Sequence, residues 1–153
     1  MVDDRDYVEA NARELERMRS LVRGMGDEEL DTPAHAVWTF ADVLAHIAFW
    51  DARVLALAAK LERGEPFTDS DTEAEDVDWI NDAARRMYHA VPPRALAELS
   101  LEIAAETDAK VASLPPDRLW PRDPDSPLYA VRANHRGEHL DEIEAALAEL
   151  RSG

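Results

Sequence analysis

Hydrophobic positions recur every three or four residues along most of the chain, which is the period of one face of an α-helix. No internal repeat and no strand-like alternation of hydrophobic and polar residues competes with this pattern. The pattern predicts five helices, at about residues 6–25, 40–64, 75–90, 94–114 and 127–153. Because the third is short, we expect an all-α protein with one domain, residues 1–153, folded as an up-and-down-type four-helix bundle.

Capping signals mark the starts of two of these helices. Thr39 is a candidate N-cap, and Asp42 follows three residues later as in a capping box. Ser126 and Pro127 offer an N-cap followed by proline in the first turn, so the last helix is predicted to begin there.

The predicted core face of the last helix contains two histidines. Its positions follow one another in steps of three and four: Leu128, Val131, His135, His139, Ile143, Leu147 and Leu150. Burying unpaired imidazole nitrogens costs free energy, so two rings on this face need a partner. Neutral imidazoles four residues apart project the same way and can hold one metal ion. The alternative is a closed core in which both rings are hydrogen-bonded to their neighbours.

His46 is the candidate for a third ligand. It lies on the shoulder of the hydrophobic face of the second predicted helix, beside Val43 and Trp50, from where it can face into the bundle. Trp50 either walls a pocket or fills the core. Asp42, one turn before His46, either orients a ligand imidazole or only caps the helix.

Charge and composition narrow the range of partners. The chain has 33 acidic and 17 basic residues, a formal net charge of −16, which argues against nucleic acid and anionic membrane surfaces as partners. No apolar run approaches the ~20 residues that span a bilayer. No export signal is visible at the start of the sequence, so we expect a cytoplasmic protein. The absence of cysteine excludes disulfides, thiolate metal sites and a cysteine nucleophile.

Three stretches resemble the DinB-like superfamily of metal-binding four-helix bundles: residues 38–46 (WTFADVLAH), 78–81 (DWIN) and 135–140 (HRGEHL). The likeness is to the branch that includes the N-terminal domain of mycothiol-dependent maleylpyruvate isomerase and the colibactin self-resistance proteins. It covers nearly the whole chain in order and length. The family has one histidine on the second helix and a His-x-x-x-His pair on the last, which His46, His135 and His139 match. The resemblance therefore implies that these three residues bind a divalent metal ion.

The resemblance leaves the reaction open, because members of the superfamily share a fold and differ in activity. Three neutral imidazoles leave positions on the ion for water or substrate. A zinc ion can lower the pKa of its water to about 7 or ionise a thiol. The chain has no thiol of its own, so a thiol must arrive with a cosubstrate.

We expect a zinc- or nickel-dependent transferase of a low-molecular-weight thiol to a small electrophile. One alternative is a metal-dependent hydrolase of a small electrophile. The other is a non-catalytic bundle that binds a ligand or a second copy as a homodimer.

Overall fold

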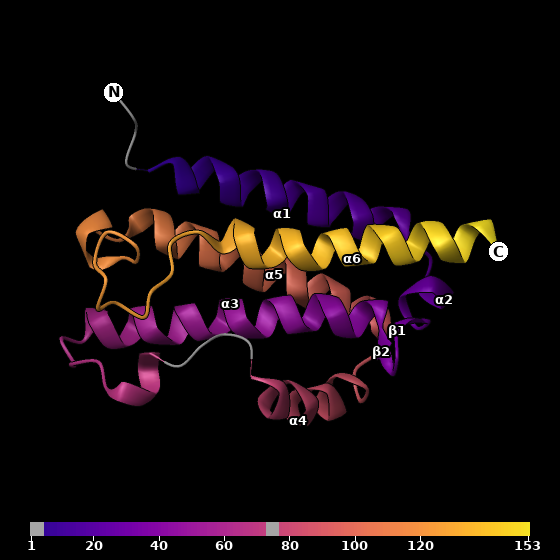
Figure 1. The fold of residues 1–153 in the computed structure, drawn as a ribbon, viewed down its shortest axis with the longest axis horizontal. Coiled ribbons are helices and arrows are strands. Elements are labelled where there is room, and N and C mark those ends of the chain that lie inside the picture. Colours follow the sequence, from indigo (N-terminus) through magenta and orange to yellow (C-terminus); the bar gives the residue numbers. More distant parts are fainter. Residues whose placement is uncertain (1–4, 73–76) are drawn as a thin grey trace.

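Four long helices lie side by side in the computed structural model, which describes residues 5–72 and 77–153 (Figure 1). They are α1 (Asp6–Gly24), α3 (Phe40–Glu62), α5 (Pro93–Ser113) and α6 (Arg132–Ser152). The shorter helices of the described residues are α2 (Asp27–Leu30), α4 (Asp78–Tyr88) and two 3₁₀ turns, η1 (Asp69–Thr72) and η2 (Pro116–Arg118). The strands β1 (Pro33–His35) and β2 (Trp38–Thr39) pair antiparallel in a small sheet. The prediction of an all-α four-helix bundle is confirmed.

The order of helix directions differs from the predicted up-and-down arrangement. α1 and α6 run one way, and α3 and α5 run the other (Figure 1). Nζ of Lys110, near the end of α5, lies 2.8 Å from Oε1 of Glu62 at the end of α3. Nε of Arg151, at the end of α6, lies 2.8 Å from Oε2 of Glu29, just beyond the end of α1. The physical reason lies in α4, which packs alongside α3 and runs in the opposite direction, so that α5 begins at the same end of the bundle as α3.

The second predicted helix begins where its capping signal placed it. The Thr39 hydroxyl accepts a hydrogen bond from the backbone N–H of Asp42 at 3.0 Å, and the Asp42 carboxylate accepts one from the backbone N–H of Thr39 at 3.0 Å. The third predicted helix begins later than expected, at Asp78, and residues 75 and 76 of that prediction lie outside the described part of the chain.

The last helix begins at Arg132, not at Pro127 as predicted. The preceding residues pair instead with the loop before them. The backbone N–H of Trp120 donates to Leu128 at 2.8 Å, and that of Ala130 donates to the Trp120 carbonyl at 3.1 Å. The Ser126 hydroxyl accepts from the backbone N–H of Leu128 at 3.2 Å, so Ser126 stabilises a local turn rather than a helix end.

The face of α6 that packs into the core is rotated from the predicted one. The fully or nearly fully buried residues are Arg132, Arg136, Leu140, Ile143 and Leu147. The predicted face is correct at Ile143 and Leu147, but before them it is one position out of phase, with His135 and His139 in place of Arg136 and Leu140. His135 and His139 are only partly buried, and Leu150 is 42% exposed. Two arginines can lie inside because the surrounding helices supply carboxylates and carbonyls for them.

The hydrophobic core lies between α3 and the other long helices. One cluster of buried side chains joins the first half of α3 to α1, α5 and α6, and a second joins the end of α3 to the loop before α6. Within the described residues, no helix combines the length and the apolar character needed to cross a membrane.

Candidate metal centre

The structure brings His46, His135 and His139 together. His46 lies near the start of α3, and the other two lie in the first half of α6. The Nε2 atom of His46 lies 3.0 Å from Nε2 of His139 and 3.2 Å from Nε2 of His135. One ligand atom from each residue lies within 4.8 Å of the other two, so the three could hold a single metal ion. These are the three residues that the sequence singled out.

The convergence of three like atoms fits a metal ion better than a hydrogen-bonded core. The Nε2 atom of a neutral imidazole either carries one proton or offers one lone pair. If His46 carried its proton on Nε2, that single N–H would face the Nε2 lone pairs of both His135 and His139. If Nε2 of His46 were unprotonated, the Nε2–H groups of His135 and His139 would compete for its one lone pair. A metal ion accepts all three lone pairs together, with each imidazole protonated at Nδ1. The donor set therefore fits a divalent metal ion.

His135 is held in the neutral form that a metal ligand requires. Burial lowers its pKa, and the electrostatic interactions with His139, His46 and two arginines of α6 lower it further, to about 2. Its Nδ1 atom is buried and has no hydrogen-bond partner among the described residues. The ring can therefore keep its Nε2 lone pair available at neutral pH.

Glu142 is a carboxylate partner of the cluster that the sequence analysis did not identify. Its Oε2 lies 3.2 Å from Nδ1 of His139, three residues earlier on the same helix. A carboxylate that accepts from Nδ1 fixes the ring and leaves Nε2 free to bind a metal. The spacing of three residues on one helix was a signal for this contact. Glu138, which lies between His135 and His139 in the sequence, is exposed.

A pocket of about 260 Å³ opens beside His46 and His139. The rest of its lining comes from β1, β2, α3 and the first turns of α4: His35, Trp38, Val43, Asp78, Asn81 and Asp82. His35 stacks on Trp38 with the ring centres 6.4 Å apart. Apart from the imidazoles, the ionisable groups of the lining are therefore carboxylates.

Trp50 and Asp42, for each of which the sequence leaves two roles open, do not line this pocket. Trp50 is buried and donates from Nε1 to the side-chain oxygen of Asn81 at 2.7 Å, which attaches α4 to α3. Asp42 caps α3, and its Oδ2 lies 2.9 Å from Nε2 of His89 at the end of α4. The carboxylate of Asp42 therefore pairs with a histidine outside the cluster, which supports the capping role rather than that of orienting a ligand.

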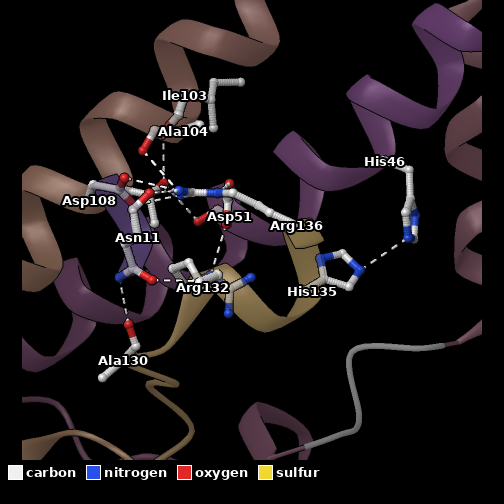
Figure 2. A network of polar contacts seen from close by, with 12 residues as sticks. Asn11, His46, Asp51, Ile103, Ala104, Asp108, Ala130, Arg132, His135 and Arg136 are labelled. Atoms are coloured by element: carbon white, nitrogen blue, oxygen red, sulfur yellow. Dashed lines mark hydrogen bonds and ion pairs between the residues drawn. The ribbon is translucent and has the colours of Figure 1, made fainter. Parts of the chain in front are cut away.

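A buried ionic network lies next to the histidines (Figure 2). Arg136, fully buried, donates to Asp51 on α3 at 3.1 Å and to the two carboxylate oxygens of Asp108 on α5 at 2.9 and 2.6 Å. Arg132 donates to the other oxygen of Asp51 at 2.8 Å. Asn11 on α1 accepts from the backbone N–H of Ala133 and donates to the carbonyl of Ala130, both at 2.8 Å.

This network is not among the features predicted from the sequence. The signal was present, because Arg132 and Arg136 continue the four-and-three spacing of the core positions of α6. Arginine on a helix face is usually solvent-exposed unless it is paired, and the partners here are remote in sequence. Asp108 shows how strongly the site is buried, since burial raises the pKa of its carboxyl even with Arg136 beside it.

Fold and site together define an all-α bundle protein with a candidate three-histidine metal centre at the edge of a pocket. The chain matches the family model of the mycothiol maleylpyruvate isomerase N-terminal domain over residues 12–144, and it belongs to this family within the DinB-like superfamily. The resemblance seen in the sequence is thereby confirmed. Searches among curated proteins and among solved structures find no match.

Proposed function

We propose that this protein is a metal-dependent transferase that joins a low-molecular-weight thiol to a small electrophile, with the ion held by His46, His135 and His139. The observation that carries the proposal is the convergence of three histidines, two of which, His46 and His139, line an open pocket of about 260 Å³. A structural metal site is usually closed by four protein ligands, whereas three leave room for a reactant.

The residues around the cluster prepare the ligands. Burial keeps His135 neutral, and Glu142 accepts from Nδ1 of His139, so both rings direct Nε2 toward the common centre. When bound there, a zinc or nickel ion supplies the Lewis acidity that turns a thiol or a water into a nucleophile at neutral pH. Trp38 and Val43 give the pocket apolar walls against which a compact electrophile can pack.

The source of the nucleophile follows from composition. The chain has no cysteine, so a thiol can only come from a cosubstrate. Mycothiol in the name of the family supports a small cellular thiol of that kind. Asp78 and Asp82 at the pocket, with a net charge of −16 on the chain, favour a neutral or cationic electrophile over an anionic one.

The test uses protein purified without an affinity tag and loaded with zinc or nickel. It is incubated with mycothiol, bacillithiol, glutathione or no thiol, each with a panel of neutral, cationic and anionic electrophiles, and products are identified by mass spectrometry. We expect a thioether product that disappears with His46→Ala and with chelation, while His35→Ala, which removes a pocket histidine outside the cluster, retains the metal and measurable turnover.

Three results would change the assignment. A product that forms without any thiol would assign the site to hydrolysis. Turnover that survives both His46→Ala and chelation would place the chemistry elsewhere in the molecule. Metal binding without turnover on any acceptor would favour a ligand-binding module.

A further inference from the structure

The carboxylate of Asp51 connects α3 to both buried arginines of α6. Its Oδ1 accepts from Nε of Arg132 at 2.8 Å, and its Oδ2 accepts from Nε of Arg136 at 3.1 Å. All three side chains are at most 1% exposed. Each carboxylate oxygen thus holds one arginine, and the two arginines are one helical turn apart.

The two helices joined in this way are the ones that carry the histidine cluster. Asp51 follows His46 by five residues on α3, and the two arginines flank His135 on α6 (Figure 2). A helix rises by about 1.5 Å per residue, whereas metal–ligand distances vary by only about 0.2 Å. A slide of α6 along α3 by even one residue would therefore destroy a site shared by His46 and His135.

The network has the directionality needed to prevent such a slide. An apolar contact between helices tolerates small shifts, but a carboxylate that accepts from two guanidinium groups has one favoured position. Burial of ionic groups rarely adds to stability beyond what well-packed apolar residues would give. A role in fixing the relative position of α3 and α6 accounts for its presence beside the cluster.

The remaining contacts of Arg136 lead to helices that carry none of the three histidines. Asp108 binds its guanidinium from α5, and the backbone carbonyl of Asn11 accepts from it at 3.2 Å on α1. Loss of Asp108 would thus weaken the packing of α5 without releasing α6 from α3. This difference between Asp51 and Asp108 allows positioning to be separated from stability.

We propose that Asp51 is a positioning residue that sets the metal affinity and ligand geometry of the histidine cluster by holding Arg132 and Arg136. The inference rests on the proposed function in one respect, that the cluster binds a divalent ion. Asp51 itself is not a ligand.

The experiment compares Asp51→Asn with Asp108→Asn in the full chain. Metal-free protein is titrated with Co²⁺ while its visible absorption spectrum is recorded, Zn²⁺ affinity is measured by competition with a chromophoric chelator, and thermal unfolding of the metal-free form reports stability. We expect Asp51→Asn to weaken Zn²⁺ binding by roughly 10-fold or more, the range for residues that orient metal ligands. Its Co²⁺ spectrum should also differ from that of the wild type, because the ligand geometry has changed.

Asp108→Asn is the matched control, because it removes a carboxylate from the same guanidinium. It should retain the wild-type Co²⁺ spectrum and a Zn²⁺ affinity within about threefold of the wild type, a smaller loss than the 10-fold expected for a lost orienting residue. We expect this even if Asp108→Asn lowers the melting temperature as much as Asp51→Asn does. If Asp51→Asn does not fold, Arg132→Lys, which keeps the charge and shortens the reach to Asp51, is measured in its place with the same expectation.

The outcomes separate this inference from the proposed function. A wild-type protein that binds neither Co²⁺ nor Zn²⁺ refutes the metal site and this inference with it. Wild-type binding combined with an unchanged affinity and spectrum in the Asp51 variant refutes the positioning role alone. So do losses of affinity in the two aspartate variants that simply follow their losses of stability.

Discussion

His46 on α3 and His139 on α6 place their Nε2 atoms 3.0 Å apart, although 93 positions of sequence separate them. Two imidazoles at this distance must share a proton or a metal ion, since two lone pairs facing each other repel. The third Nε2, from His135, lies 3.2 Å from that of His46, and one proton cannot satisfy all three. The contact between α3 and α6 is therefore the part of the fold on which the proposed chemistry depends.

Removal of one ligand should abolish stoichiometric metal binding. We expect the wild-type protein to retain about one zinc or nickel ion per chain, the stoichiometry of a single three-ligand site, after dialysis against a weak chelator. His139→Ala should retain only background metal, as measured by elemental analysis. His35→Ala, in the same pocket but outside the cluster, should match the wild type. Equal metal content in all three proteins would refute the assignment of the site.

The carboxylate next to His139 should tune the affinity without being required for binding. Glu142→Gln replaces the acceptor of the Nδ1 proton by a weaker one, so we expect Zn²⁺ affinity to fall by up to about 10-fold, the lower end for such partners because Glu142 is half-exposed. Glu138→Gln, on the same helix and exposed, serves as the control and should leave the affinity unchanged. Equal affinities in calorimetry would show that Glu142 does not orient the ring.

Sequence reasoning succeeded where the signal was local. The capping pair Thr39 and Asp42 fixes the start of α3 through contacts three residues apart, so it can be read from the sequence. The helix-turn spacing of His135 and His139 is equally local. His46 was identified as their partner from its position on an amphipathic helix and from the family resemblance.

The parts that escaped prediction depend on contacts between remote segments. The helix α6 begins at Arg132 rather than at the predicted Pro127, because residues before Arg132 form hydrogen bonds with the backbone of Trp120. The predicted core face of α6 is one residue out of phase in the first half of the helix, since hydrophobicity alone cannot reveal that Arg136 pairs with Asp51 and Asp108 inside the bundle. The direction of α5 depends on the path of the segment through α4, which periodicity does not specify.

The buried arginine at the centre of the bundle should be sensitive to truncation. Arg136→Met leaves the carboxylate of Asp108 buried without its guanidinium, and loss of one partner of a buried ion pair typically costs about 3–5 kcal/mol. Urea unfolding of the metal-free protein measures this loss. Arg23→Met, which removes an exposed ion pair with Glu16 on α1, should remain close to the wild type. A similar stability of both variants would mean that the network is better solvated than its burial indicates.

The stability of the metal-free protein should fall as the pH is lowered below 6.5, because of His135. In the unfolded chain this imidazole takes up a proton near its ordinary pKa of 6.5, whereas burial and the charges around it lower the pKa in the folded protein to about 2. Between these values the unfolded state binds more protons, so the free energy of unfolding decreases as the pH falls. The contribution of His135 is fully present above pH 6.5, and up to about 2 kcal/mol of it is lost by pH 5.

Urea unfolding of the metal-free protein at pH 7.5, 6.5, 5.8 and 5.0, with chelator present throughout, measures this slope while most carboxylates remain ionised. His135→Gln removes the titrating group and should flatten the curve between pH 6.5 and 5, whatever its effect on stability at pH 7.5. His35→Gln, in which the histidine is exposed, should keep the wild-type slope. Parallel curves for the wild type and His135→Gln would show that the folded protein accepts the proton on His135. The premise that this ring is held neutral and ready to bind a metal would then be wrong.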